Sequence, residues 1–231
     1  MAPVTSAAST TKIEDALAHL PITATIQYRK GETVYGPDRS SMNIYLVVAG
    51  SVGISRIADN SSEVLFNVVR PDELFGESAF LGDPWLAERA TALETVKLMS
   101  WTVADVDELM ERRPRLAVAL LQILARRNAE LTRHIASFAT DGVERRLARS
   151  LMYLSERLGK QTEDGSVRMI SFTHSQLSSH IGTSREVITQ YMNRFRKLGF
   201  VTYSRSCITL RKEMLRTVLG EPSVDTAVAT N

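Results

Sequence analysis

A short segment after residue 183 gathers side chains of the types that hydrogen-bond to the edges of DNA base pairs. Arg donates two hydrogen bonds to guanine, and a Glu carboxylate accepts one from the cytosine amino group. Gln or Asn both donates to and accepts from adenine. The candidate DNA-contacting residues here are Thr183, Ser184, Arg185, Glu186, Thr189, Gln190, Asn193 and Arg194. Arg196 and Lys197 follow and suit phosphates, which position a protein on DNA without reading its sequence. The chemistry predicted for this segment is recognition and not catalysis.

Two capping patterns predict the helices that carry these side chains. Thr173 is followed by Gln176, and Thr183 by Glu186, so each Thr can cap a helix while the Gln or Glu reaches back. Gly182 lies in the turn between the two helices, as in a helix-turn-helix. On the second helix we expect an apolar face packed on the core, formed by Val187, Ile188, Tyr191, Phe195 and Leu198. The segment 199–210 then predicts a β-hairpin, a wing, with Arg205 at its basic tip contacting phosphate.

Charge is distributed unevenly along the chain. Residues 1–140 carry 14 Lys and Arg against 17 Asp and Glu, whereas residues 141–220 carry 14 against 7. A local excess of positive charge indicates a polyanionic partner for the C-terminal part, and double-stranded DNA fits it. The alternative for this excess is a solvated basic surface, or a module that controls a partner protein through its C-terminal domain.

The N-terminal part is predicted to be rich in β-structure. Short alternating or β-branched runs recur between Gly, Pro and Asp turn signals, at 23–28, 44–48, 52–55, 64–69 and 95–98. Strands at this spacing are typical of a small barrel or sandwich.

A long helix is predicted between these two parts, over about 115–139, because Pro114 ends the preceding helix. Apolar residues follow a heptad spacing along it, with one polar member: Ala117, Leu121, Leu124, Asn128, Leu131, Ile135 and Phe138. Such a seam packs well against a copy of itself, and a single Asn in it favours one register. We therefore expect a homodimer. The alternative is that the stripe packs on the barrel of its own chain. Asp141-Gly142 marks a hinge after the helix.

With these residues in view, the chain resembles the bacterial CRP/FNR family, most specifically at 183–187, at Gly76-Glu77 and at 89–91. The resemblance implies an α+β fold: an N-terminal cyclic-nucleotide-binding-type β-roll of jelly-roll character, a long dimerisation helix and a C-terminal winged helix-turn-helix. We expect the roll over 12–113, the dimer helix over 114–140 and the DNA-binding domain over 141–220. Disordered tails are expected at 1–11, where the residues are small and polar, and at 221–231. RNA polymerase is an implied partner and a role as an activator is implied, although the sequence alone leaves activation and repression both open.

The resemblance also implies a ligand site in the roll. In cyclic-nucleotide-binding members a Gly-Glu segment supplies a backbone amide and a carboxylate for the ribose, and an Arg binds the cyclic phosphate. Gly76, Glu77 and Arg89 match these roles, and the candidate site also includes Ser78, Ala90 and, on the dimer helix, Leu131 and Thr132. Cyclic AMP or another cyclic nucleotide would be the effector. The alternatives are another small ligand, no ligand at all, or a structural salt bridge between Glu77 and Arg89.

Other classes of function are disfavoured by the sequence. Cys207 is the single cysteine, so neither a disulfide framework nor an iron–sulfur cluster is expected, although a redox role for this thiol stays open. The four histidines do not cluster as haem or metal ligands, and His174 and His180 are expected at the surface or against phosphate. No catalytic motif, signal peptide or membrane-spanning stretch is evident. We therefore expect a cytoplasmic protein that is not an enzyme.

Overall fold

The computed structural model describes residues 13–57, 63–82, 88–203 and 206–220. Its N-terminal elements are η1 (Ala16–His19), β1 (Ile26–Tyr28), β2 (Thr33–Tyr35), β3 (Asn43–Ala49), β4 (Val52–Ile57), β5 (Glu63–Val69), β6 (Leu74–Phe75), η2 (Glu77–Leu81), β7 (Glu88–Ala92) and β8 (Val96–Thr102). The helices α1 (Val103–Arg112), α2 (Pro114–Thr140) and α3 (Val143–Leu158) follow. The remaining elements are β9 (Lys160–Gln161), β10 (Val167–Ile170), α4 (His174–Ile181), α5 (Arg185–Lys197), β11 (Val201–Tyr203), β12 (Cys207–Leu210) and α6 (Lys212–Leu219).

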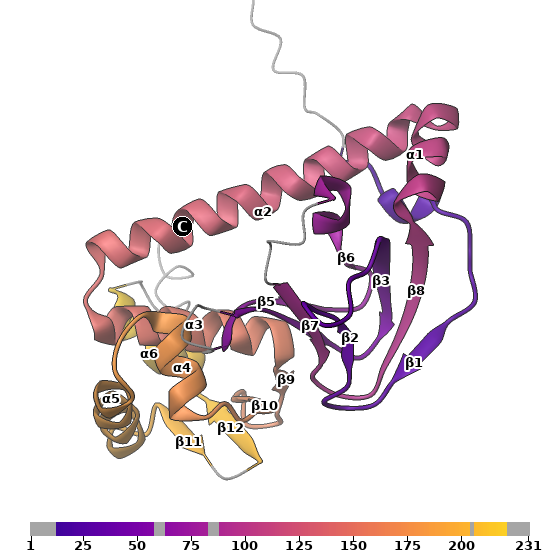
Figure 1. Cartoon of the computed structure of the whole chain (residues 1–231). Helices are drawn as coiled ribbons and strands as arrows, with labels where there is room; N and C mark the ends of the chain where they lie inside the picture. The colour runs from indigo at the N-terminus through magenta and orange to yellow at the C-terminus, as the bar shows by residue number, and fades with distance from the viewer. Residues whose placement is uncertain (1–12, 58–62, 83–87, 204–205, 221–231) are drawn as a thin grey trace, which may run out of the picture.

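The N-terminal strands form two facing four-stranded sheets, in the orders β1-β8-β3-β6 and β2-β7-β4-β5 (Figure 1). Every pairing is antiparallel. Side chains from both sheets, including the stacked rings of Tyr35, Tyr45 and Phe75, fill the space between them. The predicted β-rich domain is confirmed, with strand bounds shifted by a few residues. The short strands β2, β6 and β7 were not predicted, because they are brief and β7 lacks a run of large apolar residues.

The helix α2 packs one face on its own roll and leaves another face exposed. Leu116 and Ala119 are fully buried in a cluster with Ile44 and Trp101 of the sheet β1-β8-β3-β6. The predicted seam lies on the exposed face, where Leu121 is 66% and Ile135 is 69% exposed. The alternative that this stripe packs on its own barrel is therefore wrong.

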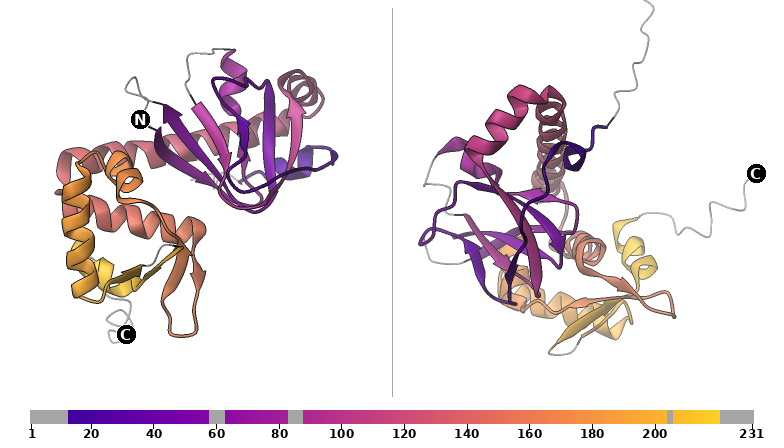
Figure 2. Two further views of the ribbon diagram at one scale, coloured as in Figure 1. Left: turned by 60° about the horizontal axis from the view of Figure 1, so that its bottom comes forward. Right: turned by 90° about the vertical axis from the view of Figure 1, so that its right-hand side faces the viewer.

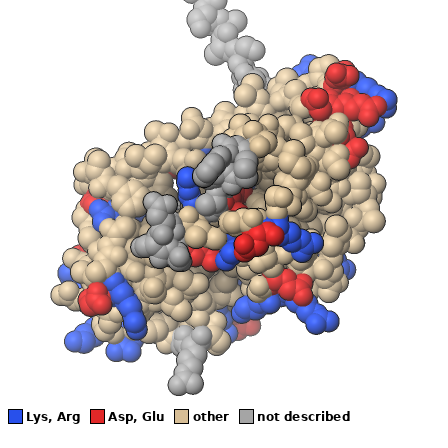
Figure 3. Space-filling model, in the orientation of Figure 1, with Lys and Arg blue, Asp and Glu red and all other residues tan. Residues whose placement is uncertain are grey.

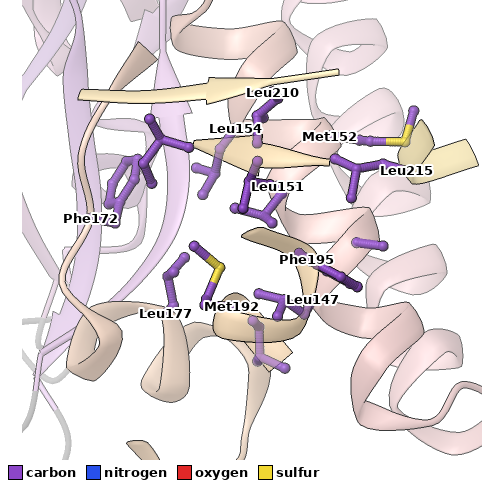
Figure 4. Packing of buried hydrophobic residues seen from close by; sticks show 14 of the residues in the cluster. Leu147, Leu151, Met152, Leu154, Phe172, Leu177, Met192, Phe195, Leu210 and Leu215 are labelled. Atoms are coloured by element: carbon purple, nitrogen blue, oxygen red, sulfur yellow. The ribbon is translucent and has the colours of Figure 1, made fainter. Parts of the chain in front are cut away.

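The C-terminal domain packs its helices against a small sheet in the order β11-β12-β10-β9. Its core brings Leu147 and Leu151 of α3 against Met192 and Phe195 of α5 (Figure 4). The hairpin β11–β12 is the predicted wing. One expectation is corrected: Leu198 is 51% exposed and Met192 is buried in its place, because α5 ends at Lys197.

The C-terminal domain lies beside the roll of its own chain (Figure 2), and its helices α3 and α4 contact β5. Leu65 packs against the C-terminal core, and its carbonyl oxygen lies 2.6 Å from His180 Nδ1 in α4. The Tyr153 hydroxyl donates to Asn67 Oδ1 over 3.1 Å. The expectation that His180 lies at the surface is therefore wrong, since its side chain is in this contact and the residue is 6% exposed.

Candidate DNA interface and ligand site

The helix α5 begins one residue later than predicted. Ser184 is the N-cap and its hydroxyl accepts from the Val187 amide over 3.3 Å, so Thr183 is not the cap. The capping box predicted for α4 is confirmed: the Thr173 hydroxyl accepts from the Gln176 amide, and the Gln176 side chain accepts from the Thr173 amide. These caps fix where each helix starts, and so which side chains of α5 point outward.

The first turn of α5 presents two charged side chains to solvent. Arg185 and Glu186 are exposed, and Gln190 is exposed one turn later. Backbone hydrogen bonding at the helix start, with the Ser184 hydroxyl, lowers the pKa of the Glu186 carboxyl. Glu186 is therefore held as a carboxylate, the form that accepts a hydrogen bond from a cytosine amino group.

Three other residues predicted to contact DNA already have partners within the chain. The Thr189 hydroxyl donates to the Arg185 carbonyl over 2.9 Å and lies 2.8 Å from His174 Nδ1. Because that hydroxyl proton is used, we assign His174 Nδ1 as the donor to Thr189. Asn193 Oδ1 accepts from the Tyr203 hydroxyl of the wing over 3.2 Å.

Arg194 is the third of these residues, and it forms an ion pair with Glu144 of α3 at 3.2 Å. This arginine is still 59% exposed along its side chain, so solvent reaches it beside the pair. Lys and Arg side chains gather at the lower left of the molecule in Figure 3, where Figure 1 places α5. Arg205 lies outside the described residues.

The roll places Gly76 where only glycine fits without strain. Its φ is +89°, and a Cβ would lie 2.6 Å from the Asn43 carbonyl oxygen. Residues with a side chain rarely adopt such a φ. The turn therefore fixes the direction of η2, which carries Glu77 and Ser78.

Glu77 is tied to the long helix. It pairs with Arg127 of α2, and the same guanidinium donates to the Leu74 carbonyl. Glu77 and Arg127 both line a groove of about 1200 Å³ between α2, β5 and α3. Leu131 and Thr132 are exposed on α2, and the Thr132 hydroxyl donates to the Asn128 carbonyl.

Arg89 does not join this group. Ala90 and Ala92 belong to the core of the roll, so alternation along β7 turns Arg89 to the opposite face of the sheet. There it pairs with Glu63 at 3.5 Å and with Asp38 at 3.8 Å. The alternative of a Glu77–Arg89 salt bridge is therefore wrong, because each residue has a different partner.

Glu88 points into the roll instead, and sequence reasoning missed it. It accepts a hydrogen bond from the Tyr35 hydroxyl and interacts with the Ser78 side chain, with Glu77 and with Arg127. The signal was present in the sequence: small apolar residues at alternate positions, Ala90 and Ala92, predict that Glu88 shares their face. His174, Tyr203 and Arg127 were missed because their contacts join distant segments.

The part of the chain that the structure describes contains neither a metal-ligand cluster nor a membrane-spanning helix. No three His, Cys, Asp or Glu side chains are grouped there to hold a metal ion. None of its helices combines the length and apolar composition needed to cross a membrane.

Comparisons with known proteins agree with this architecture. A cyclic nucleotide-binding domain model matches residues 25–113, and a Crp-like helix-turn-helix domain model matches residues 145–218. The CRP-like cAMP-activated global transcriptional regulator of Mycobacterium tuberculosis is 26% identical over 76% of this chain and 79% of its own length. The cyclic AMP receptor protein of Thermus thermophilus is 25% identical over 81% of this chain and 84% of its own.

A solved structure extends the agreement to the whole fold. A transcriptional regulator of the CRP/FNR family from Thermus thermophilus superposes with a TM-score of 0.68 and 27% identity, covering 86% of this chain and 99% of that one. The roll, the long helix and the winged helix-turn-helix therefore occur together and in this order in a known regulator. The chain belongs to the CRP/FNR family of DNA-binding transcription regulators.

Proposed function

We propose that this regulator acts as a homodimer on palindromic double-stranded DNA. The exposed apolar seam of α2 carries the proposal, because a stripe that includes Leu121 and Ile135 at 66% and 69% exposure needs a partner surface. Its copy in a second chain supplies that surface. Pairing through Ala117, Leu121, Leu124, Asn128, Leu131, Ile135 and Phe138 gives the assembly two α5 helices, one for each half-site.

Base recognition is proposed for Arg185, Glu186 and Gln190, the exposed members of the predicted set. Arg185 donates to a guanine, Glu186 accepts from the amino group of a cytosine, and Gln190 bonds to an adenine. Thr189 and Asn193 instead position the helix, since their polar atoms bond within the chain. Arg194 and Arg205 contact phosphate. Thr183 and Ser184 lie beside the helix start, where backbone amides also favour phosphate.

Site selection from random duplexes, followed by affinity measurement on the selected site, tests this proposal. Arg185→Ala should cost roughly 1–3 kcal/mol and relax preference at one base pair of each half-site. Arg205→Ala should weaken all duplexes about equally and reduce the slope of log K against log salt. Arg112→Ala, on the exposed ion-paired end of α1, is the matched control and should change neither. Equal and weak affinity of the dimer for every duplex would refute base reading.

Control by a small ligand is proposed for the roll over 12–113. Binding there would shift the population of states through the helix 114–140 and the hinge at Asp141-Gly142, which leads into the domain 141–220. The contact of Arg127 with Glu77 and Leu74 supports this route, since it joins η2 directly to α2. Cyclic AMP, which the names of two relatives mention, is the first compound to test.

RNA polymerase is the proposed partner at the promoter, in the bacterial cytoplasm.

A further inference from the structure

The cluster that the structure forms around Glu77 and Ser78 contains two carboxyl groups and one guanidinium. Glu77 and Ser78 of η2 and Glu88 of β7 lie together, with Arg127 reaching in from α2 and the Tyr35 hydroxyl from β2. Glu88 is a half-buried member of this group, held by the Tyr35 hydroxyl, which donates to it. Burial and the nearby Glu77 raise the pKa of Glu88. The balance of formal charge in this cluster is negative when both carboxyls are ionised.

In the described part of the chain, the one cation that acts on Glu88 is Arg127. Arg127 is already bonded to the Glu77 carboxylate and the Leu74 carbonyl. Arg89 lies on the outer face of its sheet with Glu63 and Asp38. The segments 58–62 and 83–87, which the structure does not describe, contain no Lys or Arg in the sequence. A phosphate placed beside Ser78 would therefore meet a carboxylate in the position where it needs a donor.

We propose that Glu88 sets the ligand class of the roll: it excludes ligands that carry a phosphate there and reserves the site for an uncharged or cationic ligand that donates hydrogen bonds. This inference rests on the proposed role of the roll as the control site. It concerns only which ligand binds, so DNA recognition by α5 does not depend on it.

The physical reason is repulsion between like charges in a partly desolvated space. Two unit charges a few ångströms apart in such a site repel strongly enough to change affinity by about tenfold or more. Replacing Glu88 by Gln removes the charge and keeps a carbonyl oxygen that can accept from Tyr35. Replacing it by Ala removes the same charge and matches Ala90 and Ala92 along the strand.

Calorimetry of the purified full-length protein with cyclic AMP and with adenosine tests the proposal, because adenosine presents the same base without the phosphate. The wild-type protein should bind cyclic AMP no more tightly than adenosine. Glu88→Gln should increase the affinity for cyclic AMP about tenfold or more, with adenosine affinity nearly unchanged. Glu88→Ala should increase the affinity for cyclic AMP as well, so the test needs only one of the two variants to fold. Thermal melting shows whether each variant is folded.

Two matched controls separate charge from structural disturbance. Tyr35→Phe perturbs the same cluster and leaves the Glu88 charge, so it should not gain affinity for cyclic AMP. Glu111→Gln removes an exposed carboxyl on α1 and should change nothing. Wild-type affinity for cyclic AMP ten times that for adenosine would overturn the proposal, and so would the absence of any gain in both Glu88 variants. DNA affinity, measured separately, reports on the proposed function.

Discussion

His180 joins the DNA-binding domain to the roll, and its replacement by Asn is expected to remove a pH dependence of stability. The imidazole is 6% exposed, its Nδ1 bonds to the Leu65 carbonyl at 2.6 Å, and among the described residues its Nε2 has no hydrogen-bond partner. The His134 ring of α2 lies edge-on to the His180 ring, with 5.1 Å between the ring centroids. An Asn amide has the reach of Nδ1 and can donate to the same carbonyl, but it does not titrate.

Burial lowers the pKa of His180 and outweighs the hydrogen bond to the Leu65 carbonyl, which raises it. The neighbouring His134 lowers the pKa further. In the unfolded chain the pKa of His180 is near its ordinary value of about 6.5. Below that pH the unfolded chain binds a proton at His180, whereas the folded chain does not. The folded state is therefore not penalised above pH 6.5 and loses stability as the pH falls below it. For one site that stays neutral when folded, the loss is at most about 1.0 kcal/mol between pH 6.5 and 5.5, because the unfolded group is already half protonated at pH 6.5.

Thermal and denaturant unfolding at pH 5.5, 6.5 and 7.5 measures this loss, with protein concentration held constant because a dimer's apparent stability depends on it. The wild-type protein should lose up to about 1.0 kcal/mol more than His180→Asn between pH 6.5 and 5.5. The lower pKa of His134 acts in both proteins and largely cancels. Parallel pH profiles for the two proteins would refute the assignment of His180 as the titrating group of this contact.

Three further substitutions test the packing and the assembly. Gly76→Ala should destabilise the roll more than Gly82→Ala. Both residues have positive φ, but of the two only Gly76 has a backbone oxygen within 2.6 Å of an added Cβ, so the expected extra cost is about 1–3 kcal/mol by denaturant unfolding. Phe195→Ala should cost about 3–5 kcal/mol, because this fully buried ring leaves a cavity in the C-terminal core, and a loss below 1 kcal/mol would contradict that packing. Ile135→Asp should shift the dimer toward monomer in sedimentation velocity, whereas Ala136→Asp, the next residue and outside the seam, should not.

The order of the main elements could be read from the sequence because local signals specify it. The heptad stripe of α2, the break at Pro114 and the turn at Asp141-Gly142 depend only on residues close together in the chain. The capping box at Thr173 is equally local, since its two partners are three residues apart. The exposed polar face of α5 follows from helical periodicity once the helix start is known.

Only the tertiary structure decided which of these side chains are available and which meet. Arg89 was expected beside Glu77, yet alternation along β7 directs it outward and directs Glu88 inward, and a shift of one residue along a strand reverses the face. Thr189 and Asn193 were expected to read bases, but His174 and Tyr203, from other elements, bond to them. Local patterns thus determined the helices and their periodic faces, whereas hydrogen-bond partners and strand faces depend on which distant segments pack together, and local spacing does not encode that choice.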